Sequence, residues 1–181
     1  MSNFFYDGIE MVLPSVAKAY PQTWAEDFLT KGIIYFTNAE IFRRDEHPER
    51  GDLLECANYV NPIFLWCTTM ESQCSRILET WNDRDSVVYV RNSLRLAERI
   101  RDAAAKQQNA VINFQVGPVV YERDLNQKRE YFWGKEIFQK DYSLSSQKEF
   151  RFALVGNFHS KTQNHIVLQL GDCSDIAEKK I

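Results

Sequence analysis

Apolar residues at every second position mark several stretches of this chain, most clearly 112–116, 149–154 and 165–170. Side chains that alternate with period two point to opposite faces of a β-strand, so each stretch covers a core with one face. Stretch 33–37 is rich in β-branched and aromatic residues, and 63–70 is a mostly apolar run of the kind found in buried strands. The chain must therefore fold around a β-sheet, to which we also assign 3–6, 87–90 and 119–121.

Helical periodicity is clearest in 93–107, where one face carries Leu96, Ala97, Ile100, Ala103 and Ala104. A second helix is expected near the N-terminus. It begins at Thr23, which has the T-x-x-E form of a capping box with Glu26, and it ends at Gly32. A short helix follows over about 38–44, with Asn38 as its cap. Strands and helices together predict an α+β fold that is strand-rich and has two main helices.

The chain is long enough for one domain. It has 181 residues, of which 44% are apolar, and it contains 12 Phe, 8 Tyr and 4 Trp. No linker, repeat or low-complexity tract divides it, so we expect a single domain over 1–181. The net charge of −3 argues against a polybasic surface for nucleic acid, although it is compatible with a local basic groove.

Targeting and cysteine patterns point to the cytoplasm. No run of about 18 apolar residues would span a membrane, and the first residues lack a basic segment followed by an apolar one. Cys56, Cys67, Cys74 and Cys173 form no C-x-x-C pair and no compact disulfide framework. We expect four reduced thiols that pack as small apolar groups, and the spacing of cysteines and histidines predicts no metal site.

The most informative polar positions lie in the second of the alternating stretches. Glu149 and Arg151 are predicted to project from the face opposite Phe150 and Phe152, and so to line a surface or a cleft. Gln147 precedes Glu149 by two residues, so a turn into the strand would present both side chains to one ligand. The simpler interpretation is an ion pair of Glu149 and Arg151 on a solvated sheet, which contributes little to stability.

A polar segment over 45–61 is the second candidate, because long loops in compact domains are often functional. Arg50 can bind a phosphate through its planar guanidinium, and Asp52 or Glu55 can hold a ribose hydroxyl. A solvated charged loop is the structural alternative. A metal site built from Asp52, Glu55 and Glu149 is another.

Aromatic residues upstream of Gln147 are the third candidate. Phe132, Trp133 and Tyr142 can clamp a planar ring or can simply belong to the core. The chain contains no G-x-G-x-x-G, P-loop, G-x-S-x-G or H-E-x-x-H motif. These absences argue against a Rossmann dehydrogenase, a P-loop NTPase, an α/β-hydrolase and a zinc protease.

Taken together, several motifs resemble those of a family of uncharacterised proteins of bacteria and their phages. The shared features are a Y-F-T strand at 35–37 followed by Phe42, an R-G-D…E loop at 50–55, an F-x-K segment at 138–140, and Q-x-E-F-R at 147–151. The resemblance runs from about residue 32 to 155, which is about two thirds of the chain.

The order of these motifs in turn resembles that of ADP-ribosyltransferases, whose late Q-x-E or E-x-E contains the catalytic glutamate. The resemblance implies a split sheet and NAD as a substrate. It assigns Glu149 to the ribose 2′-hydroxyl and to the oxocarbenium-like centre that forms as nicotinamide leaves, an electrostatic role. It assigns Gln147 to orienting the acceptor. The residues expected to contact NAD are Tyr35, Thr37, Arg50, Asp52 and Arg151.

Three functions remain open at this point. The first is an NAD-dependent ADP-ribosyltransferase, as a toxin or phage-defence effector that modifies a protein or nucleic acid. The second is a non-catalytic regulator that binds a nucleotide or a protein in the same cleft. It accounts for the absence from 3–6 of the Arg or His that ADP-ribosyltransferases use on their first strand, unless another residue such as Arg50 substitutes. The third is a metal-dependent nuclease or hydrolase that uses Asp52, Glu55 and Glu149.

Overall fold

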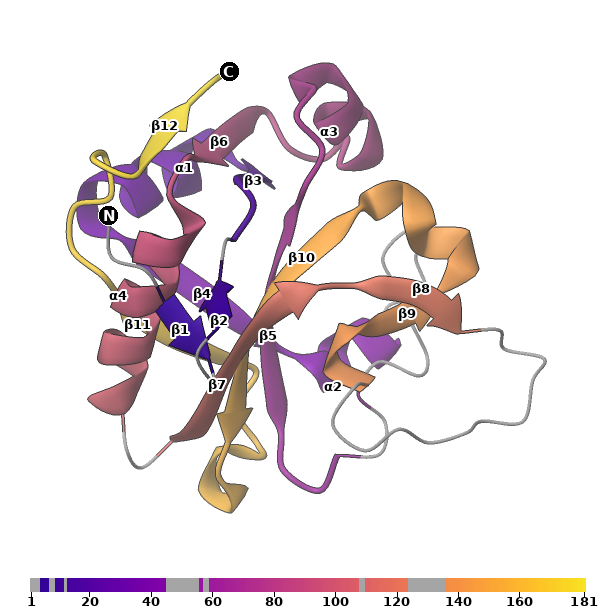
Figure 1. Ribbon diagram of the computed structural model, residues 1–181, viewed down its shortest axis with the longest axis vertical. Coiled ribbons are helices and arrows are strands. Elements are labelled where there is room, and N and C mark those ends of the chain that lie inside the picture. The colour runs from indigo at the N-terminus through magenta and orange to yellow at the C-terminus, as the bar shows by residue number, and fades with distance from the viewer. Residues whose placement is uncertain are drawn as a thin grey trace.

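The computed structural model describes residues 4–6, 9–11, 13–44, 56, 59–107, 110–123 and 136–181 (Figure 1). Its centre is an eight-stranded antiparallel sheet, in which β5 (Ile63–Thr69) is the central strand. The path of paired strands runs β11, β4, β5, β3, β6 and β12, and β10 and then β7 continue the sheet from β5. These strands are β3 (Val16–Tyr20), β4 (Ile33–Asn38), β6 (Ser86–Val90), β7 (Val111–Pro118), β10 (Glu149–Gly156), β11 (His165–Gln169) and β12 (Ala177–Lys179).

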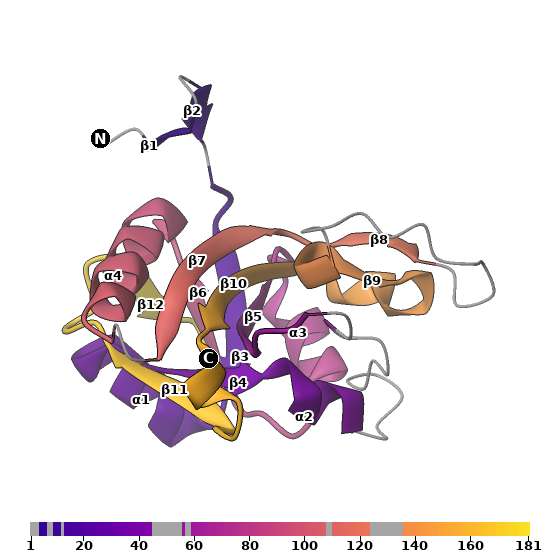
Figure 2. The same ribbon diagram turned by 90° about the horizontal axis from the view of Figure 1, so that it is seen from below.

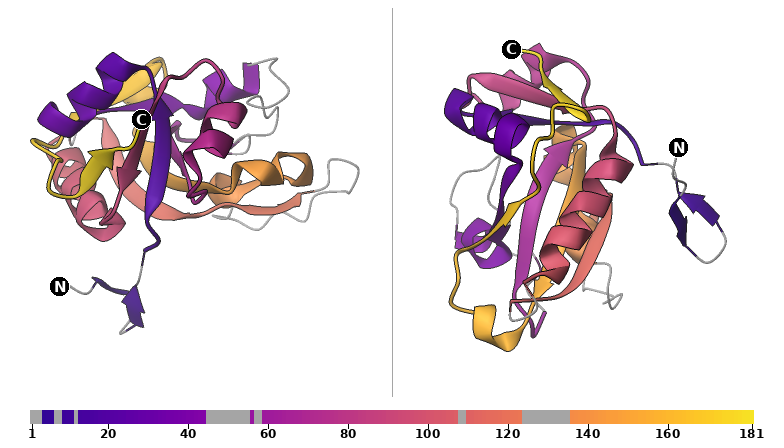
Figure 3. Two further views of the ribbon diagram at one scale, coloured as in Figure 1. Left: turned by 90° about the horizontal axis from the view of Figure 1, so that it is seen from above. Right: turned by 90° about the vertical axis from the view of Figure 1, so that its left-hand side faces the viewer.

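Helices and two small sheets complete the described part, and the predicted α+β class is confirmed. The helices are α1 (Gln22–Lys31), α2 (Ala39–Arg44), α3 (Cys74–Thr80) and α4 (Ser93–Ala105), with 3₁₀ turns η1 (Glu136–Phe138), η2 (Tyr142–Gln147) and η3 (Phe158–Ser160). The small sheets pair β1 (Phe4–Tyr6) with β2 (Ile9–Met11) and β8 (Val120–Arg123) with β9 (Gln139–Asp141). Figures 2 and 3 show the β1–β2 hairpin projecting from the rest of the molecule. In the described ranges, no helix has both the length and the apolar character needed to cross a membrane.

The sheet divides at β5. Along one edge, β10 pairs with the whole of β5. Along the other edge, β4 pairs only with the first half, where Thr37 lies opposite Leu65, and β3 pairs only at the end, where Ala17 lies opposite Thr69. The strands β3 and β4 thus diverge from the middle of β5. We call the gap between them the split.

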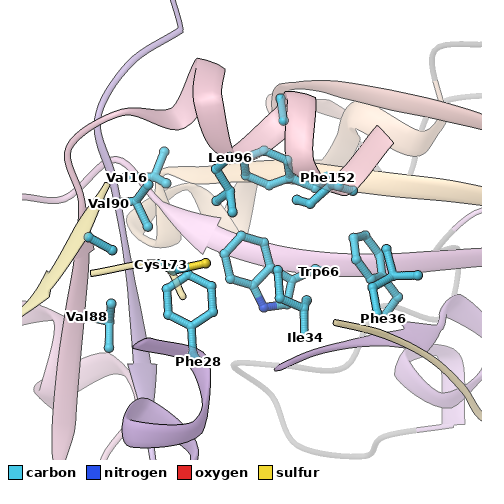
Figure 4. Close-up of a cluster of buried hydrophobic side chains, with 14 of the residues drawn as sticks. Val16, Phe28, Ile34, Phe36, Trp66, Val88, Val90, Leu96, Phe152 and Cys173 are labelled. Carbon is cyan, nitrogen blue, oxygen red and sulfur yellow. The ribbon is translucent and has the colours of Figure 1, made fainter. Parts of the chain in front are cut away.

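One face of the sheet carries the main hydrophobic core (Figure 4). Trp66 of β5 lies at its centre, with its ring 5.9 Å from that of Phe28 on α1 and 5.2 Å from that of Phe152 on β10. Leu96 and Ile100 cover the same face from α4. The apolar faces predicted for 93–107 and 149–154 therefore both pack into this one core.

The opposite face carries two smaller clusters. In one of them, Ala153 and Val155 of β10 pack with Leu65 of β5 and Ile137 of η1. Every residue of β10 is buried, so the face that carries Glu149 is covered rather than solvated. The predicted division of β10 into two faces is correct, whereas the simpler interpretation of an ion pair on a solvated sheet is wrong because η1 packs over this face.

The ends of α1 correct one prediction and confirm another. The helix starts one residue earlier than expected, with Pro21 at the N-cap and no side-chain capping bond, so the capping box at Thr23 does not form. Proline suits this position because it has a fixed φ and no N–H to satisfy. Gly32 does end the helix, in the left-handed conformation with φ of 64°. At the next helix, the Asn38 side chain accepts from the Glu40 N–H at 3.0 Å, as the sequence predicts.

Substitution of Gly32 tests this packing. A Cβ at Gly32 would lie 2.2 Å from the carbonyl oxygen of Gly171, and φ there is 64°. We expect Gly32→Ala to lower the free energy of unfolding by about 1–3 kcal/mol from backbone strain alone, with the clash adding to it. Gly171→Ala is the matched control, because φ is 78° there but nothing lies within 4 Å of the added carbon. Equal urea-denaturation midpoints for the two variants would contradict the predicted contact.

Candidate functional site

A pocket of about 550 Å³ opens at the split. Strands β3, β4 and β5 form its walls, and β9, the end of η2 and the start of β10 contribute Lys140, Gln147 and Glu149. Its volume lies within the range of small-molecule binding sites. The pocket exists because β3 and β4 diverge from the middle of β5. Side chains, and not the backbone of a neighbouring strand, line the space beside this part of β5.

The backbone of β5 makes the split polar. Successive residues of an antiparallel strand direct their N–H and C=O groups to opposite edges. The N–H of Met70 donates to the Lys148 carbonyl beside β10, so every second residue from Met70 faces β10. The N–H and C=O groups of Leu65, Cys67 and Thr69 therefore point to the other edge of β5. Leu65 pairs with β4 and Thr69 with β3, whereas the register aligns Cys67 with neither strand. The peptide groups of Cys67 therefore face the split.

Lys18 of β3 lies against this exposed peptide edge. Its Nζ donates to the Cys67 carbonyl at 2.5 Å and lies 5.6 Å and 5.5 Å from the ring centroids of Tyr20 and Trp66. Among the residues that the structure describes, no carboxylate forms an ion pair with it. Burial lowers the pKa of Lys18, and the negative charge of Glu149 only partly opposes this effect.

Glu149 is the centre of a buried ionic network. Its side chain is 2% exposed and that of Arg151 is 0% exposed. Oε1 of Glu149 lies 3.0 Å from Nε of Arg151, and Oε2 lies 3.2 Å from its Nη2 and 2.9 Å from Nζ of Lys140. Lys140 also donates to Oε1 of Gln147 at 2.8 Å, and Arg151 donates to the Ile137 carbonyl at 2.6 Å. Each of these side chains therefore has a partner.

The network fixes the charge of Glu149. Burial by itself would raise the pKa of this carboxyl group, but the positive charges of Arg151 and Lys140 outweigh burial and hold the pKa far below its usual range. Glu149 is thus ionised at neutral pH, which suits an electrostatic role and not general acid catalysis. Burial raises the pKa of the neighbouring Cys67 thiol, so this group stays protonated and is not an activated nucleophile.

Aromatic side chains form the mouth of the pocket. The rings of Trp24 on α1 and Tyr35 on β4 are stacked, with centroids 5.2 Å apart and planes 23° apart. The two residues are 46% and 41% exposed, so both rings are accessible from solvent. His165, opposite Thr37 in the β4–β11 register, also lines the pocket. The site thus joins an exposed aromatic mouth to a buried ionic interior.

Most of the site residues predicted from sequence come together in this pocket. Its lining includes Tyr35, Thr37, Gln147, Glu149 and Arg151. The predicted ion pair of Glu149 and Arg151 is present, although it is buried. Five further predicted positions lie outside the described residues, namely Arg50, Asp52, Glu55, Phe132 and Trp133. Tyr142 is 73% exposed and does not line the pocket, so it neither belongs to the core nor clamps a ligand there.

Sequence reasoning assigned no role to Lys18 or Arg84, which also line the pocket. A signal for Lys18 was present. It stands between Val16 and Tyr20 in an apolar run, and all three side chains belong to one face of β3. A charged residue at an inward position of a strand is uncommon and points to a specific partner. Arg84 lies in the loop after α3, where no apolar periodicity distinguishes it from a solvated surface residue.

The described residues contain no group of three or more His, Cys, Asp and Glu side chains that could hold a metal ion. Both oxygens of Glu149 are engaged by cations, which disfavours this carboxylate as a metal ligand. Comparison of the chain with protein-family models, curated proteins and solved structures found no match. The function is therefore argued from the pocket.

Replacing the carboxylate of Glu149 should destabilise the fold. Glu149→Gln leaves Arg151 and Lys140 buried without their counter-charge, which costs about 3–5 kcal/mol in comparable buried pairs. The control is Asp27→Asn, which breaks the exposed pair of Asp27 and Lys31, and it should cost less than about 1 kcal/mol. Chemical denaturation at neutral pH measures both. Equal losses in the two variants would mean that the network contributes no more than a surface pair.

The same network predicts a pH dependence of stability. The pKa of Glu149 is depressed on folding from a reference value of 4.5, so its contribution is fully present above that pH and is lost as the pH falls further. The difference in unfolding free energy between wild type and Glu149→Gln should therefore shrink between about pH 5 and pH 3. Urea titrations across this window provide the test, and a difference that grows on acidification would contradict it.

Proposed function

We propose that the protein binds a nucleotide or a closely related ligand, one that combines an anionic group with a planar ring, in the pocket at the split. The observation that carries the proposal is the charge of the lining. Four basic side chains line the pocket, and Glu149 is the one carboxylate among the described lining residues. The basic residues are Lys18, Arg84, Lys140 and Arg151. A concave site with such an excess of basic side chains attracts anions, even on a chain whose net charge is −3.

The aromatic mouth supports a planar ring as the other half of the ligand. Trp24 and Tyr35 already stack on each other and remain substantially exposed, so a base or a nicotinamide ring can extend the stack. Such stacking contributes about 1–3 kcal/mol per base in other proteins. A cationic interior and an aromatic mouth together match a nucleotide better than they match an inorganic anion or an apolar metabolite.

The network around Glu149 favours binding over catalysis. To stabilise a developing cation, a carboxylate has to present uncompensated negative charge to the reacting atom. The charge of Glu149 is shared with Arg151 and Lys140 at distances of about 3 Å. Its stabilisation of an oxocarbenium-like centre is correspondingly weaker, so a non-catalytic nucleotide-binding module is the leading proposal.

Truncation of the aromatic mouth tests the binding proposal. We expect Tyr35→Ala to weaken the binding of AMP or ADP by about tenfold, because one stacking surface is lost. Tyr142→Ala is the matched control, since Tyr142 is 73% exposed and does not line the pocket. Isothermal titration calorimetry on wild type and both variants gives the affinities. Failure of wild type to bind any of AMP, ADP and NAD at millimolar concentration would refute the proposal.

ADP-ribosyl transfer from NAD is the second candidate. It is supported by one specific observation: Gln147 and Glu149 line the same pocket as Tyr35 and Thr37, as the resemblance to ADP-ribosyltransferases requires. In this case Glu149 would act electrostatically at the nicotinamide ribose.

The transfer candidate predicts nicotinamide release and labelling of an acceptor in a bacterial lysate supplied with tagged NAD. Both should be lost in Glu149→Gln, provided that circular dichroism shows the variant to be folded under the assay conditions. Tyr35→Ala keeps Glu149 and serves as a comparison with weakened binding. Nucleotide binding without any turnover of NAD by wild type would leave the binding module as the function.

A further inference from the structure

We propose that the ligand enters the pocket with its phosphate first, an inference that rests on the proposed nucleotide binding. Lys18 and the Cys67 peptide at the split form a subsite for a terminal phosphate, while the base stays at the Trp24–Tyr35 mouth. The ligand class is then a nucleoside mono- or diphosphate, whose charge lies at one end. A dinucleotide such as NAD, with its phosphates between two ring systems, fits this arrangement less well.

The two ends of the pocket differ in exposure and in charge. Trp24 and Tyr35 are 46% and 41% exposed at the mouth, whereas Glu149 and Arg151 at the ionic end are 2% and 0% exposed. A ligand with one planar end and one charged end gains most by placing the ring among the exposed aromatics. Its charged end then reaches the buried cations, where a low local dielectric strengthens electrostatic attraction.

The cations of the pocket differ in whether a carboxylate already neutralises them. Arg151 and Lys140 each form an ion pair with Glu149, and Arg84 forms one with Asp83 at 3.5 Å. Among the described lining cations, Lys18 is the one without a carboxylate partner. Lys18 has the Cys67 carbonyl as its hydrogen-bond acceptor, together with the faces of Tyr20 and Trp66. Lys18 is partly buried, and withdrawing an ammonium group from water without a counter-ion is costly, so an anionic ligand would supply that counter-ion. Burial lowers the pKa of Lys18, and a bound anion would oppose this effect.

The peptide edge of β5 supplies a second group that can bind phosphate. The N–H of Cys67 faces the split on the same edge as the carbonyl that Lys18 contacts, and no strand is aligned with it there. A backbone N–H next to an ammonium group is a combination that binds phosphate oxygens. The Cys67 peptide can thus donate to the phosphate while its carbonyl holds Lys18 in place.

A purely structural role for Lys18 makes a different prediction. If the ammonium group only satisfies the Cys67 carbonyl, its removal would lower stability without changing the preference for a phosphorylated ligand. The ratio of the affinity for AMP to the affinity for adenosine therefore separates the two roles of Lys18, because the base and ribose are common to both ligands. Lys106→Met is the control, since Lys106 is an exposed lysine at the end of α4 and does not line the pocket.

We would titrate adenosine, AMP, ADP and NAD into wild type, Lys18→Met and Lys106→Met at one fixed salt concentration. Wild type and Lys106→Met should bind AMP at least about tenfold more tightly than adenosine, and Lys18→Met should lose most of this preference. An unchanged preference in Lys18→Met, or wild-type binding of adenosine or NAD as tight as that of AMP, would overturn the subsite. Absence of binding by every nucleotide would overturn the proposed function itself, which is a distinguishable result.

A measurement on the wild-type chain keeps the test valid if Lys18→Met does not fold. Acetylation of individual lysines by a water-soluble reagent can be followed by mass spectrometry. Saturating AMP should slow acetylation of Lys18 about tenfold or more, saturating adenosine should slow it much less, and Lys106 should react equally in all samples. Equal protection of Lys18 by adenosine and AMP would contradict a phosphate at this residue.

Discussion

The divergence of β3 and β4 from β5 is the constraint on which the rest of the structure depends. A central strand normally has hydrogen-bonded neighbours along both edges, yet the middle of β5 has β10 on one side and the split on the other. Buried peptide groups have to find partners. Lys18 supplies one of them by donating to the Cys67 carbonyl, and this places a cation inside the sheet. The pocket follows from the same gap.

The ionic network around Glu149 closes the inner end of that pocket. Burial of a single carboxylate would be prohibitively costly, so Arg151 and Lys140 accompany it. Arg151 also donates to the Ile137 carbonyl, and Lys140 to the amide oxygen of Gln147. Removal of Glu149 leaves two buried cations without their counter-charge. The network therefore serves stability and also leaves Lys18 as the cation that an anionic ligand can neutralise.

The sequence predicted which side chains of β10 share a face, but not the burial of that face or the role of β3, and each outcome has a physical reason. Period two in β10 predicted that Glu149 and Arg151 share a face, because side-chain direction in a strand depends only on local geometry. Burial of that face could not be predicted, since it depends on η1 folding back from elsewhere in the chain. Strand β3 went unrecognised because Lys18 interrupts its apolar run. The role of Lys18 depends on strand pairing, which one sequence does not reveal.

The most direct test of the account is a ¹H–¹⁵N spectrum of the assigned protein titrated with AMP. The account predicts that the largest shift changes occur at the backbone amide of Cys67 and at the indole N–H of Trp24, the two ends of the pocket, with the amide of Tyr35 also affected. Saturable changes confined to other parts of the molecule, or no change at millimolar AMP, would contradict the claim that the split is a nucleotide-binding site.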